Sequence, residues 1–337
     1  DLYARICNAF LSVSDTIIPE EYKVKPEESF IPNDGICKKI AMLIADRTPA
    51  IMLVGPSGSG KTNYARLIGS SYEKFGYGTF AVDAQGHLDV DELMDYTDFN
   101  KDDGILVRKG SLTTAVEEMN KAGIKSIVII NEYPSLRDEC RRSFYPLFDR
   151  CNRNYYIQHS KGQSFKYGIS FENTTFILTA NPNKKQYDVS DHAMLSNAET
   201  RRIAMIPVPY ETSKKEVTEI IKSIITNKSS FKDALKTDSH LVSKINWAMG
   251  ANAFINCNPG GDYVPYDVPY STIAHALWLG TIFGSIANAD PEKEMAEQFY
   301  AYVIEPISDN NIREFISDQL RSAGINIPGV TKKSERQ

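Results

Sequence analysis

Short apolar runs alternate with helix-compatible segments along the first two thirds of the chain. Four of the five runs are nearly continuous in apolar residues, as expected of strands that are buried on both faces. The expected strands are Ala50 to Val54, Thr79 to Asp83, Ser126 to Ile130, Thr174 to Thr179 and Ile203 to Val208. This alternation predicts an α/β domain with a parallel five-stranded sheet flanked by helices.

The pattern changes after Tyr210, and the remaining third of the chain predicts helices. One apolar helix face is formed by Val217, Ile220, Ile221 and Ile224, which recur at helical spacing. Further helices are expected over Leu241 to Ala251, Ser271 to Ala287 and Lys293 to Ile304. A separate, all-helical C-terminal domain is therefore predicted.

Composition and net charge mainly exclude certain classes of protein. The chain has 337 residues, is 42% hydrophobic, and carries 38 basic against 43 acidic residues, a net charge of -5. This balance gives no general attraction to nucleic acid, so a coat-type role is disfavoured. No apolar run approaches the roughly 18 residues of a membrane span, and we expect no membrane insertion. The five cysteines form no CxxC pair, which is typical of thiols in a reducing compartment and predicts a cytoplasmic protein.

The strongest chemical signal is a glycine-rich loop between an expected strand and an expected helix. Residues 55–62 read GPSGSGKT and match the pattern GxxxxGK[ST]. In that pattern the backbone N–H groups wrap phosphates at a helix N-terminus, the lysine reaches the β- and γ-phosphates, and the threonine hydroxyl binds Mg²⁺. The motif predicts a nucleoside triphosphate site formed by Gly55, Pro56, Ser57, Gly58, Ser59, Gly60, Lys61, Thr62 and Asn63.

Polar residues follow two other expected strands where they end. The strand over Ser126 to Ile130 is followed by Asn131 and Glu132, and the strand over Thr174 to Thr179 is followed by Ala180 and Asn181. The carboxyl ends of parallel strands meet at one edge of the sheet, where ligands collect. Glu132 is therefore a candidate general base for a water molecule, and Asn181 a candidate for holding that water in line.

Taken in order, these motifs resemble the AAA+ ATPases, and within them the MoxR and McrB-like, dynein-related branch. The motifs are residues 55–62, the strand that ends at Glu132, TANP at 179–182 and LSNAETRRI at 195–203. The resemblance covers about residues 35–290. Within it, DELM at 91–94 with GSLTTA at 110–115 is similar to the branch's insert in its second helix, and Tyr155 to Phe171 is similar to its β-hairpin before the sensor strand.

The resemblance implies a role for each of these residues. Lys61 and Thr62 form the Walker A site, with ATP and Mg²⁺ as the expected cofactors. Glu132 is the Walker B glutamate and Asn181 the sensor-1 residue. Arg202 aligns with the arginine finger that reaches the neighbouring subunit's site, with Arg201 as the second choice. The family implies a homo-oligomeric ring, commonly a hexamer.

The same resemblance divides the chain into four parts. Residues 1–34 are an N-terminal extension and 329–337 a flexible tail. Residues 35–210 are the expected nucleotide-binding α/β domain, with the helix-2 insert at about 86–112 and the β-hairpin at about 154–172. Residues 211–328 are the expected helical lid.

Two positions depart from the family pattern. Asn131 stands where the family has the Walker B aspartate; asparagine keeps an oxygen for the metal shell and loses the charge. Thr62 and Asn131 are therefore the expected metal-site residues, with slow hydrolysis or a higher Mg²⁺ requirement expected. Near Ser271, where the branch often has a sensor-2 arginine, the chain has no basic residue.

Charge is unevenly distributed along the chain. Residues 83–103 carry eight carboxylates against one lysine, and residues 141–166 carry four arginines and two lysines against one aspartate. Tyrosine and phenylalanine side chains are interleaved with the basic residues. One interpretation is a hairpin that grips single-stranded nucleic acid or an unfolded peptide. The other, which we favour, is complementarity between acidic and basic segments of neighbouring subunits.

Three functional classes follow. The favoured one is an ATP-hydrolysing ring subunit that remodels or translocates a protein or nucleic-acid partner. The second is a nucleotide-locked oligomeric scaffold with little turnover, which Asn131 makes credible. A GTP-using McrB-like motor is a variant of the first, since no residue code separates ATP from GTP. The third, a small-molecule kinase, is disfavoured by Asn181-Pro182, by Arg201-Arg202 and by the absence of an arginine-rich lid.

Overall fold

The computed structural model describes residues 11–55, 58–84, 90–100, 104–157, 167–181, 195–209 and 291–305, with isolated positions between 216 and 327. The chain forms two compact units. The first comprises residues 1–26, 32–55 and 60–208, and the second comprises 27–31, 56–59 and 209–337.

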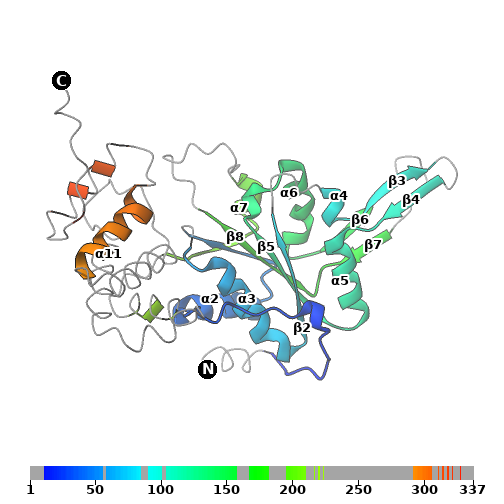
Figure 1. Cartoon of the computed structure of the whole chain (residues 1–337). Helices are drawn as coiled ribbons and strands as arrows, with labels where there is room; N and C mark the ends of the chain where they lie inside the picture. Colours follow the sequence, from blue (N-terminus) through cyan, green and yellow to red (C-terminus); the bar gives the residue numbers. More distant parts are fainter. Residues whose placement is uncertain are drawn as a thin grey trace. The chain divides into compact units, whose positions relative to one another are not determined.

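A five-stranded parallel sheet forms the centre of the first unit (Figure 1). Its strands, in spatial order, are β2 (Tyr77–Asp83), β5 (Lys125–Asn131), β8 (Thr174–Ala180), β1 (Ala50–Val54) and β9 (Ala204–Pro207). Every residue of β8 is buried, as befits a central strand of an α/β sheet covered on both faces. The predicted α/β fold with five parallel strands is confirmed.

Helices cover both faces of this sheet (Figure 1). The α-helices described in the first unit are α2 (Asp34–Ala45), α3 (Lys61–Tyr72), α4 (Val90–Leu93), α5 (Ser111–Lys121), α6 (Asp138–Phe144) and α7 (Asn197–Thr200). Single 3₁₀ turns occur at η1 (Glu20–Tyr22), η2 (Glu73–Phe75), η3 (Tyr133–Ser135) and η4 (Tyr145–Phe148). The chain crosses the sheet in one direction from β1 to β2 and in the opposite direction from β2 through β5 and β8 to β9. Right-handed connections therefore place α3, which follows β1, and α5, which follows β2, on opposite faces of the sheet.

Successive residues of each strand point to opposite faces of the sheet and pack against different layers of helices. Met52, Val128 and Phe176 belong to one core cluster, which also includes Leu112 of α5 and Phe144 of α6. The residues next to them in the strands, such as Ile51, Ile127 and Ile177, are equally buried but lie outside that cluster. This two-residue alternation is the one expected of strands whose two faces are both covered.

A hairpin that the sequence pattern did not predict begins in the acidic segment and ends just after it. Strands β3 (Tyr96–Asn100) and β4 (Gly104–Arg108) pair antiparallel after α4. Asp95 is buried, and its Oδ1 accepts hydrogen bonds from the Gly110 backbone N–H at 2.9 Å and from the Thr113 hydroxyl. A Cβ on Gly110 would lie 2.4 Å from the Leu93 carbonyl oxygen, so only glycine fits where α5 begins against α4. The Asp95 carboxylate of the acidic segment is therefore part of the packed fold and does not contribute to an acidic surface.

The expected hairpin before the sensor strand is present as β6 (Asn154–Ile157) and β7 (Tyr167–Ser170). Two of the arginines in the basic segment are nevertheless buried, Arg141 and Arg153. The Arg153 guanidinium donates to the backbone carbonyls of Leu147 at 2.7 Å and Thr174 at 2.6 Å. These two charges are therefore structural and do not add to a basic surface on the hairpin.

Two consecutive helical elements are described in the second unit, α11 (Pro291–Phe299) and the π-helix η6 (Tyr300–Ile304). They coincide with the helix predicted over Lys293 to Ile304. Of the helix predicted around Val217 to Ile224, positions 216, 219, 220 and 223 are described, and all four are helical. The helices predicted over Leu241 to Ala251 and Ser271 to Ala287 lie outside the described residues. None of the helices in the described part of the chain has the length and apolar character of a membrane-spanning helix.

Candidate functional site

The glycine-rich loop connects β1 to α3, as its motif requires. Gly58 and Gly60 have φ angles of 75° and 88°, in the left-handed region that glycine adopts without strain. Gly60 is the N-cap of α3, so the backbone turns directly into the first helical turn. Pro56 and Ser57 lie outside the described residues. The loop thus presents a helix N-terminus, the arrangement that favours phosphate binding.

Lys61 opens α3 and is buried, with 9% of its surface exposed. Its Nζ donates a hydrogen bond to the Gly55 carbonyl oxygen at 2.8 Å. The Ser59 Oγ is buried and has no hydrogen-bond partner among the described residues. A buried ammonium and an unsatisfied buried hydroxyl in one loop fit an anionic ligand that accepts hydrogen bonds. These residues therefore fit the phosphates of a nucleotide.

Thr62, the next residue of α3, is the first member of a chain of polar side chains. Its Oγ1 donates to Asn131 Oδ1 at 3.0 Å, and Asn131 Nδ2 donates to Asp83 Oδ1 at 2.6 Å. Asn131 ends β5 and Asp83 ends β2, where the two are register partners. The predicted metal-site pair, Thr62 and Asn131, is thus brought together, with oxygen ligands of the kind that Mg²⁺ prefers. Asp83 was not predicted; its signal was its place at the end of a neighbouring strand.

Glu132 follows β5 in an unusual backbone conformation. Its φ and ψ are 55° and 41°, the left-handed region that non-glycine residues rarely adopt, and its backbone N–H donates to Thr179 Oγ1 at 2.9 Å. The residue is exposed. Such local strain persists only where the surroundings impose it, and it is common at active sites. The backbone here turns Glu132 out of the strand direction at the edge of the sheet.

Asn181 comes directly after β8, the strand that pairs with β1. Val54 and Ala180 are register partners, and the Gly55 N–H donates to the Ala180 carbonyl oxygen at 3.2 Å. Asn181 therefore lies next to the point where the glycine-rich loop begins. It is half-buried.

The two arginines after α7 have different surroundings. Arg202 Nε donates to Asp149 Oδ1 at 2.6 Å, and its Nη1 donates to the Ala198 carbonyl oxygen at 3.0 Å. Its guanidinium carbon also lies 5.9 Å from the centre of the Tyr145 ring. Arg201 is exposed. Neither arginine has a described contact with the glycine-rich loop.

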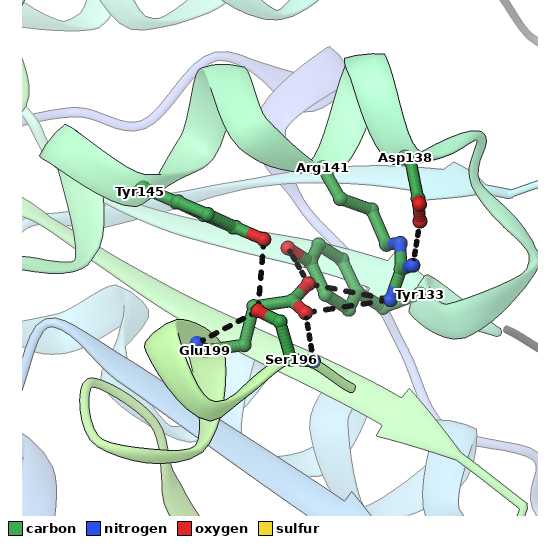
Figure 2. A network of polar contacts seen from close by, with 6 residues as sticks. All are labelled: Tyr133, Asp138, Arg141, Tyr145, Ser196 and Glu199. Atoms are coloured by element: carbon green, nitrogen blue, oxygen red, sulfur yellow. Dashed lines mark hydrogen bonds and ion pairs between the residues drawn. The ribbon is translucent and has the colours of Figure 1, made fainter. Parts of the chain in front are cut away.

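A buried polar network joins the residues that follow β5 to side chains of α6 and α7 (Figure 2). At its centre is the Glu199 carboxylate, which accepts from the Tyr133 hydroxyl at 3.1 Å, from the Ser196 N–H at 2.7 Å and from Arg141 Nη1 at 3.4 Å. Both Glu199 and Arg141 are buried, and Arg141 also pairs with Asp138. Burial, reinforced by the Glu199 charge, raises the pKa of the Tyr133 phenol far above its ordinary value.

Sequence reasoning missed this network, although one part of it had a signal. Ser196 and Glu199 form a capping box: the Ser196 Oγ accepts from the Glu199 N–H while the Glu199 carboxylate accepts from the Ser196 N–H. The Ser-x-x-Glu spacing is readable in the sequence. The contact of Glu199 with Arg141, 58 residues away, is not.

One family model matches the chain, and no curated protein does. The model is that of the AAA domain, dynein-related subfamily, and it matches residues 50–203. The matched segment begins with β1 and ends just after Arg202, so it includes the glycine-rich loop, Glu132, Asn181 and the buried network. Residues 50–203 of this chain are therefore an AAA domain of the dynein-related subfamily, the nucleotide-binding domain of an AAA+ ATPase.

Proposed function

We propose that the chain is an ATP-hydrolysing subunit of an AAA+ ring that remodels or translocates a protein or nucleic-acid partner, with Mg²⁺ as its metal. One observation carries this proposal. Lys61 and Thr62 lie on the first turn of α3. At the same edge of the sheet, Asn131 ends β5, Glu132 follows it, and Asn181 follows β8. Family membership supports both the nucleotide and the tendency to form rings.

Each residue at this edge has a role in the proposed reaction. Lys61 exchanges the Gly55 carbonyl for phosphate oxygens, while Thr62 and Asn131 hold the metal. Mg²⁺, when bound, neutralises charge on the phosphates and so favours their transfer. Asn181 orients a water molecule, and a carboxylate oxygen of Glu132 accepts its proton. The proposed enzyme is thus a nucleoside-triphosphate phosphohydrolase.

A specific observation favours a second candidate, the nucleotide-locked scaffold. Asn131 brings no charge to the metal site, so Mg²⁺ is held there by neutral protein oxygens from Thr62 and Asn131. Weak metal binding would slow hydrolysis while leaving the phosphate contacts of Lys61 in place. The two candidates differ in turnover and agree on nucleotide binding. GTP in place of ATP is compatible with either.

Glutamine in place of Glu132 tests which candidate holds. If Glu132 is the general base, Glu132→Gln lowers phosphate release by about a hundredfold or more and leaves nucleotide binding intact. Phosphate release is measured over a series of protein concentrations, because ring assembly makes turnover rise steeply with concentration. Glu139→Gln, an exposed residue of α6, is the matched control. A wild-type rate that is near zero and flat with concentration supports the scaffold instead.

We also propose that Arg202 acts on the nucleotide of a neighbouring subunit. Asp149, Ala198 and Tyr145 engage its Nε, Nη1 and planar face, and its Nη2 makes no hydrogen bond to the described residues. The guanidinium is therefore held in a fixed orientation with one nitrogen available to a phosphate. Supplying this cation from another subunit would make hydrolysis depend on assembly.

Paired alanine variants test this role. Arg202→Ala is expected to lower turnover by about a thousandfold, the usual worth of an arginine finger, without weakening nucleotide binding. Its ion pair with Asp149 is partly exposed, so the stability loss stays under about 1 kcal/mol. Arg201→Ala is the neighbouring control and retains most turnover. Loss of turnover with Arg201→Ala alone would transfer the role to that residue, and loss of nucleotide binding with Arg202→Ala would place Arg202 in its own chain's site.

The client is proposed to be a protein or nucleic-acid strand held near the β6–β7 hairpin. Tyr156 of β6 is 46% exposed, but the buried Arg141 and Arg153 leave fewer cations for a phosphate backbone than the sequence suggests. Tyr155, on the same strand, donates from its hydroxyl to the Asp95 carbonyl oxygen at 2.8 Å, so the basic and acidic segments touch within one chain. This reduced charge favours an unfolded peptide, held by exposed aromatic side chains such as Tyr156, over nucleic acid as the strand at the hairpin.

A further inference from the structure

Asn131 is held from both sides, and its two partners differ in chemistry. On one side its amide Nδ2 donates to the Asp83 carboxylate at 2.6 Å, and on the other its Oδ1 accepts from the Thr62 hydroxyl at 3.0 Å. A carboxylate can only accept hydrogen bonds, whereas an amide has one donating and one accepting end. Asp83 therefore dictates that the oxygen of Asn131, and not its NH₂ group, faces Thr62.

The sheet fixes the distance between the two side chains. Asp83 and Asn131 are register partners at the ends of β2 and β5, and the Ala84 N–H donates to the Asn131 carbonyl oxygen at 2.9 Å just beyond them. Asp83 is exposed, so water solvates the rest of its carboxylate, as a charged group requires. The register of the sheet therefore brings Asp83 and Asn131 together at the edge where Thr62 lies.

We propose that Asp83 is a positioning residue for the Mg²⁺–nucleotide site: it orients the Asn131 oxygen toward Thr62 and the metal, and it supplies from the next strand the negative charge that Asn131 lacks. This inference rests on the proposed nucleotide-binding function of the same site. It accounts for how an asparagine can stand at a position where a charged oxygen ligand is expected. Outer partners of this kind commonly tune metal affinity through the ligand they hold.

The pairing has a consequence for the aspartate that the family would place at 131. In an Asn131→Asp variant two carboxylates would face each other where an amide and a carboxylate now meet, and they would repel. Restoring the aspartate alone is therefore not expected to improve metal binding. Exchanging the two residues, as Asp83→Asn with Asn131→Asp, restores one charge and one hydrogen bond with its direction reversed.

The test is a charge-exchange cycle on the full chain, read out by Mg²⁺-dependent binding of a fluorescent ATP analogue. Asp83→Asn is expected to raise the Mg²⁺ concentration for half-maximal binding by about ten- to a hundredfold. Binding measured in EDTA should not change. Asn131→Asp alone is expected to bind Mg²⁺ no better than wild type, and the exchange variant should bind it better than either single variant. Asp15→Asn, an exposed residue of the N-terminal segment, is the control.

The cycle separates this inference from the function on which it rests. Equal Mg²⁺ dependence of wild type and Asp83→Asn overturns the inference while the nucleotide site stands, and so does better Mg²⁺ binding by Asn131→Asp than by the exchange variant. Failure of the wild type to bind the analogue with or without Mg²⁺ overturns the proposed function itself. Thermal unfolding without nucleotide checks that each variant is folded. If Asp83→Asn does not fold, the comparison of Asn131→Asp with the exchange variant still decides, because a purely structural Asp83 predicts no gain from its removal there.

Discussion

Alanine in place of Lys61 is expected to weaken nucleotide binding by about a hundredfold, the equivalent of a charge-assisted hydrogen bond worth about 3 kcal/mol. The ammonium is buried at the start of α3 and donates to the Gly55 carbonyl oxygen. Phosphate oxygens are stronger acceptors than this carbonyl because they are charged. Isothermal titration with ATP and Mg²⁺ measures the loss directly.

A second lysine provides the control for this variant. Lys39 lies on α2, is exposed, and has the same charge, so Lys39→Ala changes the net charge equally without touching the loop. Thermal unfolding of both variants without nucleotide shows whether the fold is intact. A dissociation constant for Lys61→Ala within about threefold of wild type, in a folded protein, would contradict the assignment of the phosphate site to this loop.

The parts of the fold that the sequence predicted well are those with local signals. The run over Ala50 to Val54 is continuously apolar because both faces of β1 are covered, and the glycine pattern after it has one compatible backbone path. The structure brings the predicted Thr62 and Asn131 together for the same reason, since strand ends and helix starts share one edge in this topology.

The parts that the sequence did not predict depend on contacts between distant residues. Asp83 and Asn131 are 48 residues apart; each lies at the end of an expected strand, but only the order of the strands in the sheet makes them partners. Strand β3 lies in the acidic segment, and β4, which follows that segment, has a run of three apolar residues that is too short to identify a strand by its pattern. Arg153 resembles a surface cation in the sequence, yet it is buried because two backbone carbonyls, Leu147 and Thr174, need its donors. Pairing of this kind is decided by packing and not by local propensity.

The largest loss of stability is expected from Glu199→Ala. This change removes the buried carboxylate that pairs with Arg141, leaving Arg141 only the exposed Asp138, and it deprives the Tyr133 hydroxyl of its acceptor (Figure 2). Breaking a buried ion pair by deleting one partner costs about 3 to 5 kcal/mol, because the remaining charge stays in a medium that solvates it poorly. Urea unfolding of the full chain measures the change in free energy of unfolding.

Two milder variants separate charge from hydrogen bonding at Glu199. Glu199→Gln keeps an oxygen for Tyr133 and removes the charge, so a loss close to that of Glu199→Ala would assign the stabilisation to the ion pair. Tyr133→Phe removes one hydrogen bond and is expected to cost about 1 kcal/mol. Glu139→Ala, on an exposed face of α6, should stay within about 0.5 kcal/mol of wild type. An unchanged stability in Glu199→Ala would mean that water reaches Arg141 as soon as the carboxylate is gone. The segment between Glu132 and the arginine pair would then be less rigid than its buried contacts indicate. The orientation of Arg202 would then depend on its own contacts with Asp149, Ala198 and Tyr145.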